Sequence, residues 1–474
     1  MSTKPTLNPE QKTAFKAIQK FLEHPSANVF ILKGYAGTGK TFLMQQLGQW
    51  LTEHEQSFCL LASTGRAASV LKGKTGFPAK TVHSELYNFS KVDGIDDRML
   101  EEAAEMDHAG QMSLQFTTRK PDEEKQLYIV DEASMLSGDL TKDVLFAQFG
   151  SGVLLNDFFE VVGKNKIIFV GDPCQLPPVG QGFSPALDLE WLAGQNKVAL
   201  SYTLEKIERT EASNDILTLA GAVRDMSLQK EWELYLKLPA DGLKNVKLYA
   251  ADTELFNVYF KKYKETGTNE TLAIARSNKM VAKINNAMRR GLYGKTNIPL
   301  YIDEVLLVTQ NNYKVPLTNG DFVVVCELGD ISSKASLKFQ NVRVKSVATG
   351  IEYNIILSLD SLYSTTGNLS NNQMKELMMD FSYRMREKSI STNTAAYKKE
   401  MLEDDYLNCL RVTYGYAVTC HKAQGGEWNN VFLFLDNDNN GMYNMPPQVL
   451  CKWWYTSITR ARRELHLVKH WWVK

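Results

Sequence analysis

Residues 34–41 read GYAGTGKT, and they lie between an apolar run at 29–32 and a helix-like run that begins at Phe42. A strand, a glycine loop and a helix in this order can turn backbone N–H groups around a phosphate. The dipole of the helix adds a positive end at the same place. The stretch therefore predicts an α/β core that binds a nucleoside triphosphate, and an incidental glycine turn is the weaker interpretation.

The loop also supplies two side chains with distinct tasks. We expect Lys40 to neutralise phosphate oxygens and Thr41 to hold Mg²⁺ through its hydroxyl. The residues expected to contact the nucleotide here are Gly37, Thr38, Gly39, Lys40 and Thr41.

Length and composition allow a folded chain of several domains. With 474 residues, 44% of them apolar, roughly two to four domains of ordinary size are expected. The 54 basic and 54 acidic residues cancel. This balance counts mildly against a protein that coats nucleic acid through bulk charge, although a local basic channel stays possible. We find no run long enough for a membrane span, no signal peptide, and six scattered cysteines without metal or disulfide spacing.

Two neighbouring carboxylates end the apolar run at 128–130. Such a pair suits triphosphate hydrolysis, because one acid can hold the metal while the other polarises a water for attack. We assign Asp131 to the metal and Glu132 to the water. Acidic pairs at strand ends are common, so the assignment depends on the phosphate loop.

Two glutamines lie where they could read the nucleotide. Gln175 follows the buried-strand pattern at 167–170 in a loop stiffened by prolines, and its amide suits a γ-phosphate sensor. Gln11 lies in the first turn of the helix expected from Asn8, where its amide could meet the edge of adenine or simply face solvent.

Polar residues follow the strand expected at 58–62 and recur near residue 81. Thr64 and Arg66 come first, and Thr81 and His83 follow. Hydroxyl and guanidinium groups at strand ends can hold a phosphate backbone. The same residues also commonly cap the next helix.

The α/β pattern is interrupted twice. Residues 87–121 contain two short strand patterns around an acidic stretch, and residues 300–408 contain alternating strands followed by a charged helical stretch. We therefore assign 1–86 and 122–197 to a first core, 87–121 to an insertion in it, 198–299 and 409–474 to a second core, and 300–408 to an insertion in that one. The strand spacing in 300–408 suggests a small β-barrel with a helical arm.

Seven motifs in order, GYAGTGKT, STGRAA, DEAS, GDPCQLPPV, EKIERT, TCHKAQGGEW and YTSITRAR, resemble those of superfamily 1 helicases. They are most similar to the 5′-to-3′ branch with RecD and Dda. The resemblance implies two RecA-like P-loop domains in tandem, with a pin inserted in the first and an SH3-like β-barrel in the second. It also implies ATP and Mg²⁺ as cofactors, and single-stranded or forked DNA as partner.

The resemblance assigns further roles by motif. Gln11 would read adenine, Gln175 would couple hydrolysis to movement, and Glu427 would contact the nucleotide. Arg209 and Arg460 of the second core would act as arginine fingers. The DNA track would be lined by Thr64, Arg66, Thr81, His83, Thr419, His421 and Lys422. For strand separation Phe89 and Phe116 are the candidates, because an aromatic face can stack on a base pair.

Together these patterns favour an ATP-dependent DNA helicase that translocates 5′-to-3′ and unwinds duplexes. We expect a monomer, without membrane attachment, in the cytoplasm of a bacterial or phage-infected cell, with a role in repair or recombination. An RNA or hybrid helicase of the same architecture remains an alternative, because stacking and phosphate contacts tolerate either sugar. A nucleotide-gated binding switch is the other.

Overall fold

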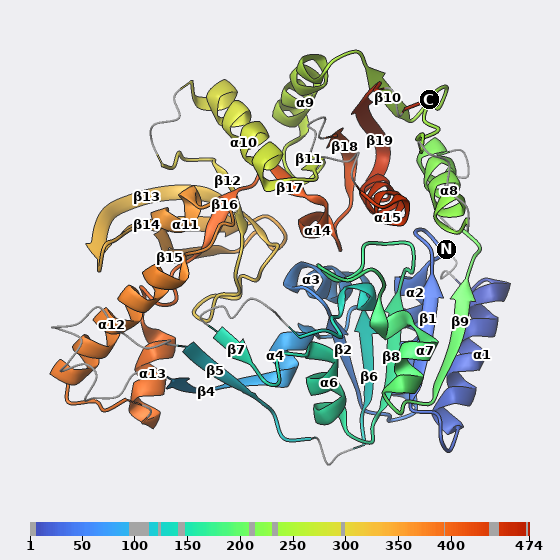
Figure 1. The fold of residues 1–474 in the computed structure, drawn as a ribbon, viewed down its shortest axis with the longest axis horizontal. Helices are drawn as coiled ribbons and strands as arrows, with labels where there is room; N and C mark the ends of the chain where they lie inside the picture. Colours follow the sequence, from blue (N-terminus) through green and yellow to red (C-terminus); the bar gives the residue numbers. More distant parts are fainter. Residues whose placement is uncertain are drawn as a thin grey trace.

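The computed structural model describes residues 6–93, 113–121, 125–140, 147–207, 214–229, 236–294, 299–392, 394–435, 445–470 and 473–474. Within these residues the chain forms two parallel sheets, an antiparallel sheet and a small three-stranded sheet. Helices cover the parallel sheets, which gives the layered α/β architecture expected for tandem RecA-like domains (Figure 1).

The first core is built on the six-stranded parallel sheet, in the order β3-β2-β6-β8-β1-β9. Its central strands are mostly apolar and buried, as strands covered on both faces must be. The strands are β1 (Val29–Gly34), β2 (Phe58–Ala62), β3 (Ala79–Thr81), β6 (Leu127–Asp131), β8 (Lys166–Gly171) and β9 (Ala199–Leu204). The helices are α1 (Pro9–Glu23), α2 (Lys40–Glu53), α3 (Gly65–Thr75), α4 (Val82–Leu86), α6 (Leu154–Val162) and α7 (Leu189–Gly194).

One predicted boundary of this core is wrong. We expected the second core to open at residue 198, but β9 pairs in parallel with β1 along its whole length, from Val29 opposite Ala199 to Gly34 opposite Leu204. The strand therefore completes the edge of the first sheet beside the phosphate loop.

The second core is built on the parallel sheet β10-β19-β18-β11-β17. Its strands are β10 (Val246–Tyr249), β11 (Thr271–Ala275), β17 (Ala417–Thr419), β18 (Trp428–Phe434) and β19 (Ala461–Val468). Its helices are α8 (Asp215–Ser227), α9 (Asp252–Thr266), α10 (Asn278–Tyr293), α14 (Cys420–Ala423) and α15 (Pro447–Ile458). The last helix, α15, ends at Ile458, and the chain enters β19 at Ala461.

The antiparallel sheet interrupts the second core, in the order β15-β14-β13-β12-β16. Its strands are β12 (Val305–Val308), β13 (Phe322–Lys334), β14 (Leu337–Ser346), β15 (Glu352–Ser358) and β16 (Val412–Tyr414). Buried and exposed residues alternate along β14, and one face packs on the second core. The boundary at 408 is corrected here, because β16 pairs with β12.

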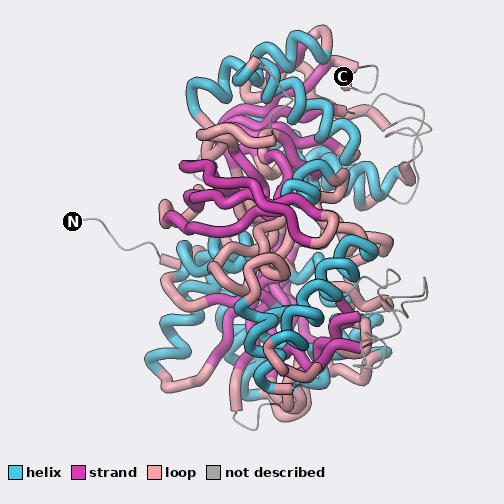
Figure 2. The backbone as a smooth tube through the Cα atoms, turned by 90° about the vertical axis from the view of Figure 1, so that its left-hand side faces the viewer, coloured by secondary structure: helices cyan, strands magenta, loops and turns pink. Residues whose placement is uncertain are grey.

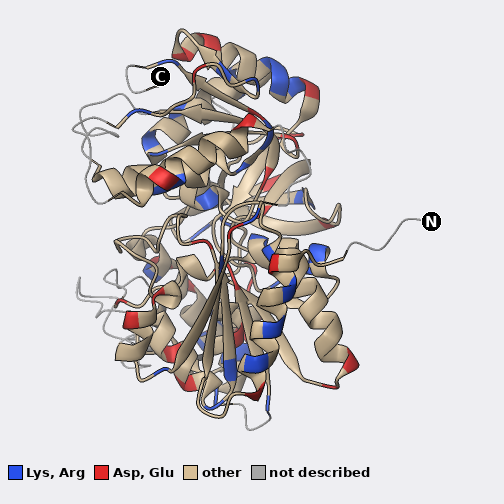
Figure 3. Cartoon of the chain, turned by 90° about the vertical axis from the view of Figure 1, so that its right-hand side faces the viewer, with Lys and Arg blue, Asp and Glu red and all other residues tan. Residues whose placement is uncertain are grey.

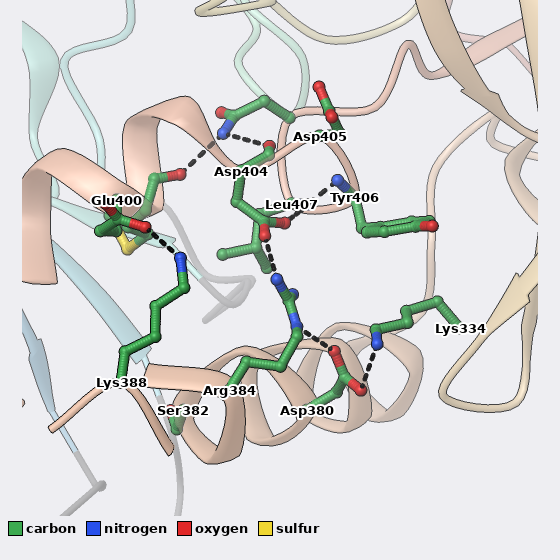
Figure 4. Close-up of polar contacts among 12 residues, drawn as sticks. Lys334, Asp380, Ser382, Arg384, Lys388, Glu400, Asp404, Asp405, Tyr406 and Leu407 are labelled. Carbon is green, nitrogen blue, oxygen red and sulfur yellow. Dashed lines mark hydrogen bonds and ion pairs between the residues drawn. The ribbon is translucent and has the colours of Figure 1, made fainter. Parts of the chain in front are cut away.

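A helical arm follows this sheet, as expected for residues 371–406. It comprises α12 (Asn371–Glu387) and α13 (Ala395–Glu403), preceded by the short α11 (Leu359–Tyr363). Arg384 of α12 lies between Asp380 at 2.8 Å and Asp404 at 2.5 Å, and Lys388 pairs with Glu400 at 2.8 Å (Figure 4). These pairs tie α12 to α13 and to the turn that follows it.

The small sheet lies beside the first core and is ordered β4-β5-β7. The two strands expected in the insertion are present as β4 (Tyr87–Asp93) and β5 (Ser113–Thr118), and they pair antiparallel. The third strand, β7 (Ala147–Phe149), comes from a segment that we had assigned to the core, so the insertion does not form this sheet alone. The acidic stretch at 96–107 lies outside the described residues.

The two cores are stacked one on the other with the antiparallel sheet along one side (Figure 2). Acidic and basic side chains are interspersed over both (Figure 3), which agrees with the equal numbers of the two. In the described part of the chain, no helix has both the length and the apolar character needed to cross a membrane.

Candidate functional site

The phosphate loop leaves the N-terminus of α2 open. Its N-cap is Gly39, in the left-handed region at φ 79°, and no side chain caps the helix. Gly37 is also left-handed, at φ 83°. Lys40 Nζ donates to the carbonyls of Gly34 at 2.6 Å and Tyr35 at 3.1 Å. The uncapped N–H groups and the adjacent ammonium form a cradle that fits phosphate.

Gln11 is buried at this loop rather than solvated. Its Nε2 donates to the carbonyl of Thr38 at 3.1 Å, and its Oε1 accepts from the backbone of Asn8 at 3.1 Å in a capping box. Both ends of the amide are therefore used to join α1 to the phosphate loop. Each end of the amide keeps one further hydrogen-bonding position, a second N–H on Nε2 and a second lone pair on Oε1, that a base edge can use.

The carboxylate pair stands at the end of β6, as predicted. Glu132 is in the left-handed region at φ 51°, uncommon for a side-chain-bearing residue, and its N–H donates to Asp131 Oδ1 at 2.9 Å. Burial, and next the charge of Glu132, raise the pKa of Asp131 to about 7, while Lys40 opposes the shift. A bound cation would reverse it by favouring the ionised acid.

The oxygen donors here fit Mg²⁺, which usually takes one or two protein oxygens and fills its shell with water and substrate phosphates. Thr41 and Asp131 are the residues that would hold it. Among the described residues no three His, Cys, Asp or Glu side chains converge on a common point, so a fully protein-made metal cage is not formed there.

Asp172 is a site residue that our sequence analysis missed. It follows β8, it is 0% exposed, and its Oδ1 accepts from Cys174 N at 3.0 Å. Burial raises its pKa, and Lys40 opposes this shift. An acid directly after a buried strand is the same signal that identified Asp131, so it could have been found.

Gln175 lies in the same loop and is buried. No hydrogen-bond partner within the described residues reaches its Oε1, although this oxygen is shielded from solvent. A buried acceptor without a partner is costly in a folded protein, so it needs an explanation. A side chain held in this state is suited to respond to a ligand bound near this loop.

The second core reaches both loops through α15. The hydroxyl of Tyr455 accepts from Ala36 N at 2.9 Å in the phosphate loop and donates to Asp172 Oδ2 at 2.8 Å. Thr456 Oγ1 accepts from Leu176 N at 2.9 Å. From α8 the guanidinium of Arg224 lies 4.6 Å from the ring centroid of Tyr35. The triphosphate cradle is thus in direct contact with the second core.

The structure describes only one of the two predicted arginine fingers. Arg209 lies outside the described residues. Arg460 lies one turn after Thr456 and is buried, with Nε donating to the Thr456 carbonyl at 3.0 Å and Nη1 to that of Gly426 at 3.2 Å. Its guanidinium is therefore held by its own core.

Glu427 lies at the boundary of the cores. It pairs with Arg462 at 3.1 Å and approaches Lys74 of α3 at 4.0 Å. These two contacts link the first core to the second.

Of the residues predicted for a DNA track, the two threonines of the first core act as helix caps. Thr64 accepts from Ala67 N at 3.2 Å and Thr81 from Ser84 N at 3.1 Å. The backbone of each helix start depends on them, so only their remaining capacity is left for a phosphate.

Arg66 is enclosed where three parts of the molecule meet. Its guanidinium lies 4.4 Å from the ring centroid of Trp428 in the second core and 5.0 Å from that of Phe322 in the antiparallel sheet. Burial lowers its pKa to about 10, while nearby Asp321 opposes this. In this arrangement Arg66 joins the three parts.

The remaining track residues lie at the ends of short elements. His83 is exposed, with its ring centroid 5.8 Å from those of Tyr87 and Phe149. Thr419 precedes α14, which carries His421 and Lys422, and burial lowers the pKa of both. In Figure 1 α14 faces α3 across the boundary between the cores.

The packing of Phe116 contradicts its predicted role in strand separation. It is only 9% exposed, and its ring stacks on Phe149 at 4.5 Å within the core of the first domain. A ring packed in this way has no free face for a base pair. The side chain of Phe89 lies outside the described residues.

Two protein families match this chain. Residues 6–236 match the family described as AAA domain, and residues 414–468 match the family described as UvrD-like helicase C-terminal domain. The first match spans the first core and the start of the second, and the second match covers the segment with TCHKAQGGEW and YTSITRAR.

Curated relatives have low sequence identity to this chain, but the alignments cover most of it. An uncharacterized protein of Acanthamoeba polyphaga mimivirus is 22% identical over 97% of this chain and 99% of its own length. The RecBCD enzyme subunit RecD of Buchnera aphidicola is 23% identical over 72% of this chain, and the ATP-dependent RecD2 DNA helicase of Deinococcus radiodurans 22% identical over 91%. The matches cover 53% and 46% of those two proteins, about half of their length.

Among solved structures, a Pif1 helicase from Bacteroides in complex with ADP-AlF3 and single-stranded DNA has a TM-score of 0.49 and 17% identity. The alignment covers 98% of this chain and 93% of that one.

Proposed function

Because this chain belongs to the RecD-like superfamily 1 helicases, we propose that it is an ATP-driven motor that moves 5′-to-3′ along single-stranded DNA and unwinds duplexes. The observation that carries the proposal is the contact between Tyr455 of the second core and the phosphate loop of the first. A triphosphate site that touches both cores can change their separation when its ligand changes.

The residues of the first core supply the hydrolytic chemistry. The open N-terminus of α2 and Lys40 bind the phosphates, Asp131 and Thr41 hold the cation, and Glu132 orients the attacking water. Mg²⁺ supplies neutralisation of the charge that develops on the phosphate oxygens. The left-handed backbone of Glu132 is the kind of strain found at sites where a side chain is aimed at a reacting group.

The second core completes the site in trans. We propose that Arg460, and Arg209 with it, turn toward the γ-phosphate as the cores close, and that Glu427 approaches the nucleotide. Arg460 lies one turn beyond Thr456, which already contacts the first core. Its present partners are two carbonyls and the Thr459 hydroxyl, all uncharged, and an anionic phosphate can bind the guanidinium more strongly than they do.

The DNA track would run along α3, His83 and the start of α14, across both cores. We propose that the small sheet serves as the pin and the antiparallel sheet as an SH3-like module against which the pin rests. We propose DNA repair or recombination as the process in which the protein acts.

Polarity-resolved unwinding tests the proposal. Duplexes of DNA and of RNA with 5′ or 3′ tails are offered with ATP and Mg²⁺, and Lys40→Ala serves as the inactive control. We expect strand separation only with the 5′-tailed DNA. Equal activity on RNA would select the RNA helicase, unwinding from 3′ tails would overturn the direction, and an ATPase without response to single strands would indicate a switch.

The arginine finger has its own test. Replacing Arg460 by Ala should leave ATP binding nearly intact and lower DNA-stimulated hydrolysis by about 10³-fold or more. The matched control is Arg463→Ala, which removes an exposed arginine three residues further on. Wild-type turnover in Arg460→Ala would remove this residue from the mechanism.

A further inference from the structure

The hydroxyl of Tyr455 joins three segments that are far apart in sequence. It bonds the backbone of Ala36, 419 residues away, and the carboxylate of Asp172, 283 residues away. The first belongs to the phosphate loop and the second to the loop of Gln175. A single phenolic oxygen of the second core thus contacts both nucleotide loops of the first.

The directions of the two bonds follow from the chemistry of the hydroxyl. Tyr455 is 2% exposed, and burial holds its pKa well above its ordinary value, so the phenol keeps its proton. A phenol has one proton to donate. It donates to the carboxylate of Asp172 and accepts from the N–H of Ala36, and neither bond can be exchanged for the other.

The carboxylate of Asp172 is affected by changes at the phosphate loop. Asp172 is buried, which raises its pKa, and the positive charge of Lys40 opposes this shift. When phosphate binds to Lys40, the field at Asp172 changes because a negative charge arrives near the same ammonium. The backbone of Ala36 moves with the loop itself. Nucleotide binding can therefore affect the Tyr455 hydroxyl in two ways, through Ala36 and through Asp172.

The helix that carries Tyr455 leads to the residues that would act on the nucleotide. Lys452, Tyr455 and Thr456 share one face of α15, and each bonds to the first core. Arg460 follows one turn later and donates to the carbonyl of Thr456. Because α15 ends at Ile458, a displacement sensed at Tyr455 would reach Arg460 through the turn after the helix and through its bond to Thr456.

We propose that Tyr455 is a positioning residue that couples the state of the phosphate loop to the grip of the second core. The proposal rests on the proposed function and adds to it the route of coupling. The hydroxyl does not touch the reacting atoms. It acts through Ala36 and Asp172. Its loss should therefore uncouple ATP hydrolysis from DNA binding, while ATP and single-stranded DNA each still bind.

The test is Tyr455→Phe, which removes the hydroxyl and keeps the ring. Its matched control is Tyr259→Phe, which removes another buried phenol of the second core, one that donates to the carbonyl of Tyr416 far from the loops. For each variant we measure ATP affinity, single-stranded DNA affinity with and without a non-hydrolysable ATP analogue, and hydrolysis with and without DNA.

We expect the stimulation of hydrolysis by DNA to fall about tenfold in Tyr455→Phe, with ATP affinity changed by less than about threefold, because a charge-assisted bond is lost outside the phosphate contacts. The effect of the analogue on DNA affinity should shrink in parallel. Tyr259→Phe should keep both ratios. Asp172→Asn should reduce the stimulation as well, and the double variant should be no worse than the more impaired single one.

Unchanged stimulation in a folded Tyr455→Phe protein would overturn the proposal, as would an equal loss in Tyr259→Phe. Additive effects of Tyr455→Phe and Asp172→Asn would also contradict it. If the wild-type protein shows no response to DNA, the proposed function itself fails, which distinguishes the two results.

Discussion

The two cores share an architecture, yet only one of them has a place for a triphosphate. In the first core β1 leads through a glycine loop to α2, whose N-terminus is uncapped. In the second core β11 leads through Ser277 to α10, and the Ser277 hydroxyl accepts from Met280 N at 3.1 Å. The second helix start is closed by its own side chain, while the first is left for a ligand.

This difference shows that the fold alone does not create the site. A helix start after a parallel strand has free N–H groups in either core. Whether they bind a phosphate depends on the N-cap, a side chain in one case and a left-handed glycine in the other. The second core is then available to serve the site from outside, through α15 and α8.

Among the changes that test the difference between the two helix starts, the largest expected effect comes from closing the open one. In Gly39→Ala the new Cβ would lie 2.5 Å from Gln11 Nε2 and would strain the left-handed backbone. We expect ATP hydrolysis to fall by about 10²-fold or more, because the donors aimed at the phosphates are displaced. Steady-state ATPase and nucleotide binding measure this.

Gly76→Ala is the matched control, since Gly76 has nearly the same backbone, φ 80°, but open space around its Cβ position. It should lower stability by about 1–2 kcal/mol and keep the rate. An equal loss of activity in both variants would mean that backbone strain, not the cradle, is responsible.

The cores should also respond to pH in opposite directions. In the first core burial raises the pKa of Asp131 to about 7, so its contribution to stability is present at low pH and is lost as the pH rises through that value. In the second core burial lowers the pKa of His466 to about 4, so its contribution is present above pH 6.5 and is lost as the pH falls.

Thermal unfolding without nucleotide or metal at pH 5 and pH 8 separates the two. Between pH 8 and pH 5 protonation of His466, whose ring centroid lies 4.0 Å from that of Phe432, should cost about 2 kcal/mol of stability. In the wild type protonation of Asp131 offsets much of this loss, so His466→Phe should be more stable at pH 5 than at pH 8. Relative to the wild type, the gain in unfolding free energy of Asp131→Asn should be largest at pH 8. Parallel pH profiles for all three proteins would contradict the assignment.

The smallest expected effect is loss of the cap in the second core. Ser277→Ala removes one hydroxyl and should cost about 1 kcal/mol of stability. The ATPase rate should not change, because α10 does not take part in the nucleotide site. Denaturant unfolding measures the first and steady-state turnover the second. A large loss of turnover would show that the start of α10 contributes to the reaction.

The parts of the site that depend on neighbours in sequence could be predicted. The loop around Lys40 and the acids at the end of β6 both follow from a strand pattern and the residues directly after it. The parts that depend on distant pairing could not. The pattern of β9 says that it is a strand, but only its hydrogen bonds to β1 say to which sheet it belongs.

The same limit explains the side chains that were misjudged. An aromatic residue in a short strand can be exposed or packed, and Phe116 is packed because β7, a strand from elsewhere, places Phe149 over it. The sequence shows Tyr455 only as part of a motif, since its partners lie hundreds of residues away. For Gln11 the sequence does not decide between a ligand contact and the surface, while in the structure Gln11 joins α1 to the phosphate loop.

The enclosure of Arg66 between Trp428 and Phe322 has a consequence for any polymer that enters the boundary of the cores. Stacking uses the faces of the guanidinium, and its N–H donors lie in its plane, where Nε has no hydrogen-bond partner within the described residues. A backbone phosphate that reaches this edge can bind the cation while the rings stay in place. One charge can then hold the polymer and fasten the three parts of the molecule together.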